Sequence, residues 1–161
     1  MVADEDLEAI SRQLGRPARG VVEIAHRCSC GQPDVVKTAP RLEDGTPFPT
    51  VYYLTCPRAA AAIGTLEASG VMRDMNEALT VDATLAAEYA NAHEQYLADR
   101  EAIAHVEEID GITAGGMPTR VKCLHVLVAH ALAAGPGVNP LGDQALAMLD
   151  DWGSHGKCGE C

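Results

Sequence analysis

Two cysteines stand one residue apart in the segment Arg27-Cys28-Ser29-Cys30-Gly31-Gln32-Pro33. A Cys-x-Cys turn lets both thiolates reach one metal ion, and zinc binds about four such ligands in a tetrahedron with Zn–S near 2.3 Å. Two further thiols, Cys56 and Cys123, each stand at the expected start of a helix. The positive end of the helix dipole favours the thiolate that a metal needs. The sequence therefore predicts a closed zinc site formed by Cys28, Cys30, Cys56 and Cys123.

Other interpretations of the cysteines remain open. An iron–sulfur cluster also prefers thiolate ligands, but the chain has no ferredoxin-like run of closely spaced cysteines. Buried cysteines also serve as small apolar core residues. Cys158 and Cys161 have a Cys-x-x-Cys spacing that is typical of metal or redox sites, and with Cys28 and Cys30 they form a rival ligand set. Because chain ends fray, we expect residues 153–161 to be a flexible tail and residues 1–10 to be loosely held.

The residues around Cys123 suggest a second function, a metal-dependent hydrolase or transferase acting on a small anionic substrate. His125 follows Cys123 closely enough to be a ligand or to touch one. A buried histidine on an apolar helix is more often a hydrogen-bonded core residue than a ligand, and His130 stands in such a helix. A neutral imidazole can act as a general base, and cationic side chains bind anions. The candidate catalytic residues are His125, His130 and Lys122. The candidate substrate-binding residues are Arg41, Arg120, Lys122 and Asn139.

The elements that must position these residues follow from hydrophobic periodicity and turn signals. We expect strands over residues 20–26, 34–38 and 50–55, joined as an antiparallel meander. We expect helices over residues 4–14, 58–69, 82–106, 120–134 and 140–152, with a short helical piece near 72–79. The loop 40–49 contains three prolines and could form a rim over the site. The fold class is therefore α+β, a small N-terminal antiparallel sheet packed against about five helices.

Length and composition limit the possible functions. The chain has 161 residues, which predicts a single domain over residues 1–161. Its formal net charge of −11 argues against a broad nucleic-acid surface and against docking on an anionic membrane. The N-terminus is acidic and no apolar run is long enough to span a membrane, so we expect a cytoplasmic protein. A protein partner or a homodimer remains compatible with these features.

Several motifs together resemble the bacterial family known as domain of unknown function 501, in the style of its actinobacterial branch. The resemblance extends from about residue 11 to residue 152. The motifs are Arg27-Cys28-Ser29-Cys30-Gly31-Gln32-Pro33, Thr46-Pro47-Phe48-Pro49-Thr50, Tyr53-Leu54-Thr55-Cys56-Pro57, Val121-Lys122-Cys123-Leu124-His125, Ala129-His130 and Asn139-Pro140-Leu141-Gly142.

The resemblance adds to the metal hypothesis but implies no activity. Some members carry Cys-x-His at the position of Cys28-x-Cys30, and cysteine and histidine are interchangeable as zinc ligands. The family pattern includes Cys56, Cys123, His125 and His130, but it does not include the C-terminal cysteine pair. Members' genes tend to neighbour those for a septum-formation initiator, enolase and an exopolyphosphatase. That neighbourhood implies a third possibility, an adaptor linked to cell division that binds its partner through the helix at 82–106.

Overall fold

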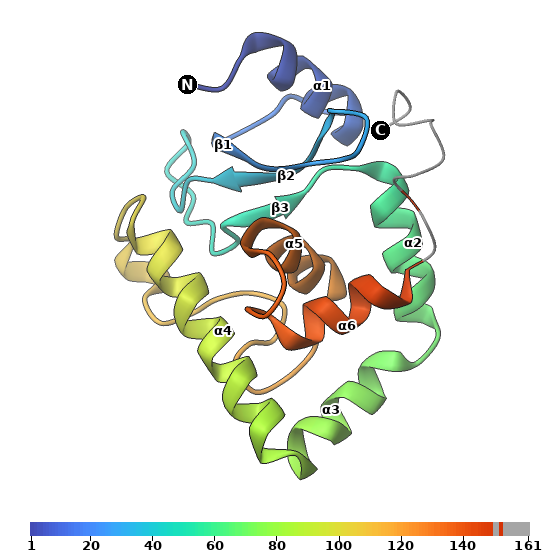
Figure 1. The fold of residues 1–161 in the computed structure, drawn as a ribbon. Helices are drawn as coiled ribbons and strands as arrows, with labels where there is room; N and C mark the ends of the chain where they lie inside the picture. Colours follow the sequence, from blue (N-terminus) through green and yellow to red (C-terminus); the bar gives the residue numbers. More distant parts are fainter. Residues whose placement is uncertain (150–151, 153–161) are drawn as a thin grey trace.

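Three runs rich in β-branched or aromatic residues form an antiparallel sheet at the N-terminal end of the protein (Figure 1). The structure is a computed structural model, and it describes residues 1–149 and residue 152. The strands are β1 (Val21–Arg27), β2 (Pro33–Thr38) and β3 (Tyr52–Leu54), in the spatial order β1-β2-β3. Both outer strands run antiparallel to β2 and therefore end at the same end of the sheet. Cys28 directly follows β1 there, and Cys56 follows β3 after one further residue.

Within the described residues, six α-helices accompany the sheet, so the predicted α+β fold class is confirmed. They are α1 (Asp4–Leu14), α2 (Pro57–Ala68), α3 (Val71–Val81), α4 (Ala83–Glu101), α5 (Leu124–Ala134) and α6 (Pro140–Met148), and a short 3₁₀ helix, η1, spans Glu107–Ile109. Pro57 stands at the first position of α2, where the amide hydrogen that proline lacks would have no partner within the helix. The C-terminal pair Cys158 and Cys161 and the expected tail at 153–161 lie outside the described residues.

Helix α5 is the centre of the core, as its lack of charged residues predicts. It lies between the sheet and α6 (Figure 1), and Leu124, Leu127 and His130 are completely buried in it. Gly142 permits the close approach of α6 to α5, because a Cβ at this position would collide with the carbonyl oxygen of Leu127. Helix α5 begins at Leu124, one residue before His125, so the candidate site lies at the N-terminal end of the central helix.

The predicted helix at 120–134 begins later than expected, at Leu124. Residues 120–122 are instead held by contacts outside the helix. The Lys122 amide donates to the Gly115 carbonyl at 2.7 Å, and Asn76 bonds both backbone groups of Val121 at 2.9 and 3.0 Å. Cys123 is therefore the extended residue just before α5 rather than a residue of its first turn, with φ −149° and ψ 111°.

Helix α4 is shorter than the predicted helix at 82–106, and it ends at Glu101. Arg100 lies in its last turn with 1% of its surface exposed. Its guanidinium donates to the carbonyl oxygens of Pro49, Ile109 and Ile112 at 2.9, 2.7 and 2.5 Å. Ile109 and Ile112 both follow α4 in sequence. Their hydrogen bonds to the buried guanidinium hold the chain after α4 as a loop and η1 instead of a continued helix.

The large apolar side chains of α4 pack inward, which bears on the adaptor hypothesis. Leu85, Tyr89 and Tyr96 are buried, and α4 contributes none of the exposed large apolar residues in the described part of the chain. The apolar stripe that would favour a partner on this helix is thus absent from its described surface. No helix in the described residues combines the length and apolarity needed to cross a membrane.

Candidate functional site

The thiol of Cys123 is positioned by a glycine loop rather than by its own helix. The Cys123 amide and the Lys122 amide both donate to the carbonyl of Gly115, at 3.4 and 2.7 Å. Gly116 has a φ of +97°, and a Cβ there would collide with the backbone of Arg120. Only glycine fits this turn without strain. The loop therefore fixes the residue before α5 and directs it toward the neighbouring helix α2.

His125 turns one ring nitrogen toward Cys123 and the other toward α2. Its Nδ1 lies 3.9 Å from the Cys123 Sγ, and its Nε2 lies 3.2 Å from the carbonyl oxygen of Ala60. A carbonyl oxygen can only accept, so Nε2 must carry a hydrogen and donate it. The contact with Ala60 thus fixes the ring orientation and leaves Nδ1 to face the thiol.

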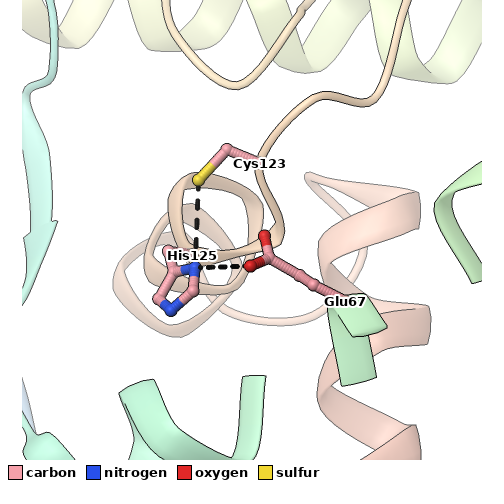
Figure 2. A group of neighbouring side chains, drawn as sticks. All are labelled: Glu67, Cys123 and His125. Atoms are coloured by element: carbon pink, nitrogen blue, oxygen red, sulfur yellow. Dashed lines mark hydrogen bonds and ion pairs between the residues drawn. The ribbon is translucent and has the colours of Figure 1, made fainter. Parts of the chain in front are cut away.

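Glu67, from the last turn of α2, completes the group (Figure 2). One of its carboxylate oxygens, Oε1, lies 3.3 Å from Nδ1 of His125. The other, Oε2, accepts the amide hydrogen of Leu124 at 2.9 Å, so it satisfies an unpaired donor at the start of α5. The potential ligand atoms of Glu67, Cys123 and His125 all lie within 4.8 Å of one another.

The electrostatics of the group follow from these contacts. The hydrogen bond with His125 lowers the pKa of the Cys123 thiol, with backbone amides of the first turn of α5 as a further cause. The hydrogen bond with Cys123 raises the pKa of His125 to about 9, against the opposing effect of burial. The group as a whole favours positive charge at its centre, in the form of a proton or of a metal ion.

A cavity of about 600 Å³ opens beside the group. Cys123 and His125 line it, together with Gln13 from α1, Tyr53 from β3 and Thr55, which follows β3. The thiol and the imidazole are both partly exposed, so a small molecule in the cavity can reach them. Glu67 does not line the cavity and lies behind the pair that does.

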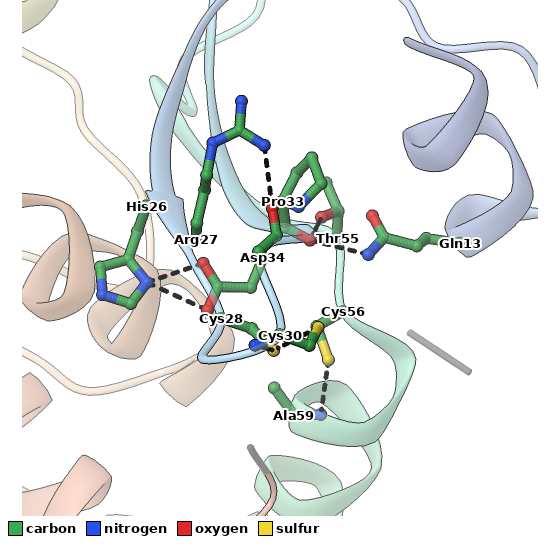
Figure 3. A network of polar contacts seen from close by, with 11 residues as sticks. Gln13, His26, Arg27, Cys28, Cys30, Pro33, Asp34, Thr55, Cys56 and Ala59 are labelled. Carbon is green, nitrogen blue, oxygen red and sulfur yellow. Dashed lines mark hydrogen bonds and ion pairs between the residues drawn. The ribbon is translucent and has the colours of Figure 1, made fainter. Parts of the chain in front are cut away.

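The other three predicted ligands gather at the end of the sheet (Figure 3). The Sγ atoms of Cys28 and Cys30 lie 3.0 Å apart in the turn after β1. Cys56, immediately before α2, is completely buried and its Sγ accepts the Ala59 amide at 3.5 Å. Among the described residues, no compact group of three potential ligands includes any of these cysteines. The four-cysteine site stays a prediction, and the geometry gives Cys123 different neighbours.

The residues predicted to bind an anion lie apart from the cavity. Arg41 is exposed and pairs with Glu108 at 2.8 Å, and Arg120 and Lys122 are exposed. None of them lines the cavity beside Cys123, and neither does Asn139. The structure therefore does not assemble the predicted cationic pocket around the Cys123 thiol.

His130 and Asn139 form a separate buried pair in the core. The Asn139 Oδ1 accepts the Gly142 amide at 2.8 Å, so its Nδ2 donates to Nδ1 of His130 at 3.1 Å. The His130 ring stacks on Tyr52 at a centroid distance of 5.6 Å, and burial lowers its pKa to about 4. A neutral, enclosed imidazole of this kind is a core residue, in keeping with the second of the two roles considered for it.

Sequence reasoning missed Glu67, although the chain contains a signal for it. Helix α2 is rich in alanine, and Glu67 is its only acidic residue. A single carboxylate on an otherwise weakly polar helix suggests a specific partner. That partner stands 57 positions away in sequence, at Leu124, which no local pattern reveals. A second group of potential ligands, Glu101, His105 and Asp110, lies on the exposed surface, as acidic clusters commonly do.

Comparison with known proteins adds a family to this description. The family model described as "Protein of unknown function (DUF501)" matches residues 24–147, which is more than half of the chain and confirms the resemblance inferred from the motifs. The matched region contains all three members of the Glu67, Cys123 and His125 group. No curated protein and no solved structure matches the chain.

Proposed function

The chain belongs to the DUF501 family, whose description assigns no activity, and we propose from its own residues that it binds a zinc ion through Glu67, Cys123 and His125. One observation carries the proposal: three electron-pair donors converge on one point, and two of them are oriented by a contact on the far side. His125 is oriented by the Ala60 carbonyl and Glu67 by the Leu124 amide. Such outer hydrogen bonds are typical of metal ligands.

The distances suit a tetrahedral zinc ion. Zn–S near 2.3 Å and Zn–N and Zn–O near 2.0–2.2 Å place sulfur about 3.6 Å from nitrogen and nitrogen about 3.4 Å from oxygen. In the structure, the Cys123 Sγ lies 3.9 Å from Nδ1 of His125, which lies 3.3 Å from Oε1 of Glu67. Small side-chain rotations are sufficient to accommodate the ion. A mixed set of one sulfur, one nitrogen and one oxygen ligand is also within the chemistry of zinc.

Three protein ligands leave a fourth position of the ion open. Because Cys123 and His125 line the cavity, a water molecule or a small ligand can occupy that position. Zinc lowers the pKa of a bound water to about 7, which is the basis of metal-assisted hydrolysis. This supports the hydrolase or transferase alternative. The candidate anion-binding residues Arg41, Arg120 and Lys122 lie outside the cavity lining, so the proposal ends at an accessible metal site.

The same group favours a second candidate function, that of a nucleophilic cysteine. Without a metal, the lowered pKa of the thiol and the raised pKa of the imidazole favour a thiolate beside an imidazolium, at the start of a helix and facing a cavity. This is the arrangement that activates cysteine nucleophiles. It predicts rapid alkylation of Cys123 by iodoacetamide in metal-free protein. Zinc binding and alkylation would then exclude each other, because both use the same sulfur.

The test is a zinc competition titration with a chromophoric chelator on the full chain and on single variants. We expect one tightly bound zinc ion, and at least a 100-fold weaker site in Cys123→Ser and His125→Asn, since even outer hydrogen bonds contribute about 10- to 100-fold. Glu67→Gln keeps the acceptor for the Leu124 amide, so it tests the ligand without removing the helix contact. Circular dichroism spectra check that each variant is folded.

The matched control is Cys30→Ser, which removes an exposed thiol outside the group. Zinc affinity unchanged in this variant, together with its loss in Cys123→Ser, supports the proposal. The four-cysteine site predicts instead that Cys28→Ser and Cys30→Ser weaken binding as strongly as Cys123→Ser. A chain that binds no zinc but alkylates rapidly at Cys123 would leave the nucleophile as the function.

A further inference from the structure

The Cys28–Cys30 turn is a preorganised loop at the end of β1 (Figure 3). The Gly31 amide donates to the Cys28 carbonyl at 2.9 Å, and the Cys28 amide donates to the Gln32 carbonyl at 2.9 Å. Gly31 has a φ of +90°, a conformation that glycine adopts without strain. These contacts keep the two cysteine side chains on the same side of the turn.

The turn is also anchored from outside. The guanidinium of Arg27 donates to the Gly31 carbonyl at 3.0 Å and to both carboxylate oxygens of Asp6 on α1, at 2.9 and 2.7 Å. The Arg27 side chain thus links the loop at Gly31 to Asp6 of α1. Two thiols in so constrained a loop have a high effective concentration toward each other.

The distance between the two sulfur atoms assigns a chemistry to the turn. They lie 3.0 Å apart, and a disulfide bond is about 2.03–2.05 Å long, so bonding requires an approach of about 1 Å. We propose that Cys28 and Cys30 are a thiol–disulfide exchange site, which closes to a disulfide by reaction with a small-molecule disulfide and reopens by reaction with a small thiol. This site is separate from the group around Cys123, and its chemistry does not depend on zinc.

Exposure assigns a role to each sulfur. Cys30 is exposed and meets the incoming disulfide, whereas Cys28 is 6% exposed and is shielded from it. The Cys30 amide donates to the Cys28 Sγ at 3.5 Å, a contact that stabilises negative charge on this sulfur. Cys28 is therefore suited to be the second nucleophile during oxidation and the leaving thiolate during reduction.

The exchange balances in two steps. The Cys30 thiolate attacks one sulfur of the disulfide R–S–S–R, forms a mixed disulfide Cys30–S–S–R and releases RS⁻. The Cys28 thiolate then attacks the Cys30 sulfur, forms the Cys28–Cys30 bond and releases the second RS⁻. Two protein thiols are oxidised, the small disulfide is reduced to two thiols, and the two protons pass from the cysteines to the released thiolates.

The experiment equilibrates the full chain with mixtures of reduced and oxidised glutathione in the presence of a metal chelator. After acid quenching and alkylation, tryptic cleavage after Arg27 and Lys37 releases residues 28–37, which contain both cysteines. We expect this peptide to change reversibly between two forms. One is doubly alkylated, and the other is an unalkylated disulfide form, which is two hydrogen atoms lighter than the reduced peptide before alkylation. Cys56→Ser is the control, and it should titrate like the unmodified chain.

Single variants separate the two roles. Cys28→Ser should accumulate a glutathione adduct on Cys30, because the resolving thiol is gone. Cys30→Ser should form several-fold less adduct on the shielded Cys28. The proposal is overturned if the peptide stays doubly alkylated at every glutathione ratio, if Cys28 forms its bond with another cysteine, or if the two variants form adducts equally. Zinc affinity in Cys28→Ser should be unchanged, so a failure of this proposal is distinguishable from a failure of the zinc site.

Discussion

The buried imidazole of His130 should make the protein sensitive to acid. Burial lowers its pKa to about 4, and its single observed polar partner among the described residues, Asn139, donates to it and so favours the neutral ring. Asp99 and Asp143 oppose the shift without reversing it. In the unfolded chain the pKa returns to about 6.5. Between these values the unfolded state binds more protons than the folded state, so stability falls as the pH is lowered from about 6.5 to 4.

The size of the effect follows from the same two pKa values. A difference of about 2.5 pH units corresponds to about 3 kcal/mol at the acid limit, and to about 2.5 kcal/mol at pH 4.5. His130→Gln removes the titration, and its side-chain oxygen can still accept from Asn139. Other groups titrate in both proteins, so the comparison isolates residue 130.

The assay is urea unfolding of both proteins at pH 7 and at pH 4.5. We expect His130→Gln to be less stable than the unmodified chain at neutral pH, because the stacking on Tyr52 is lost. Acidification should then destabilise the unmodified chain by about 2.5 kcal/mol more than the variant. Equal losses in the two proteins would refute the reasoning, because His130 would then have the same pKa in the folded and unfolded states.

Two further stability predictions come with matched controls. Arg100→Met leaves three carbonyls, of which that of Ile109 is in a buried hydrogen bond, without their donor and should cost about 3–5 kcal/mol in urea unfolding, whereas the exposed Arg73→Met should change stability by less than about 0.5 kcal/mol. A cost below about 1 kcal/mol for Arg100→Met would show that water replaces the guanidinium. Gly142→Ala should cost about 1–3 kcal/mol by forcing α6 away from Leu127, whereas Gly64→Ala, with open space on α2, should be neutral or stabilising by up to about 1 kcal/mol. Equal effects of the two glycine changes would contradict the close contact between α5 and α6.

The sheet and most helices could be predicted from the sequence because their signals are local. The aromatic run at Tyr52-Tyr53 favours a strand by its own composition, and Gly70 interrupts the helical pattern between α2 and α3. The predicted start of α5 was wrong by four residues. The observed start depends on contacts with Asn76 and with the glycine loop at 115–116 rather than on helix propensity. Local signals were therefore sufficient to predict the fold class, whereas predicting this helix boundary would have required knowledge of tertiary contacts.

The candidate site was only partly predictable for the same reason. Cys123 and His125 stand in one short motif, so the sequence marks both. Glu67 joins them through contacts across the fold, and a pattern of cysteines does not identify a carboxylate as the third partner. Sequence reasoning also combined all motif cysteines into one ligand set. Among the described residues, Cys123 instead falls in a compact group with Glu67 and His125, whereas no such group contains Cys28, Cys30 or Cys56.

The most direct test of the proposed zinc site is the zinc X-ray absorption spectrum of the zinc-loaded full chain, which reports the identity and distance of each ligand. The geometry of Glu67, Cys123 and His125 predicts one sulfur ligand at about 2.3 Å, with the remaining ligands being nitrogen or oxygen at about 2.0–2.2 Å. A spectrum with four sulfur ligands and no nitrogen or oxygen ligand would contradict the site formed by Glu67, Cys123 and His125. It would support the four-cysteine site instead. A chain that retains no zinc after loading and desalting would contradict zinc binding altogether.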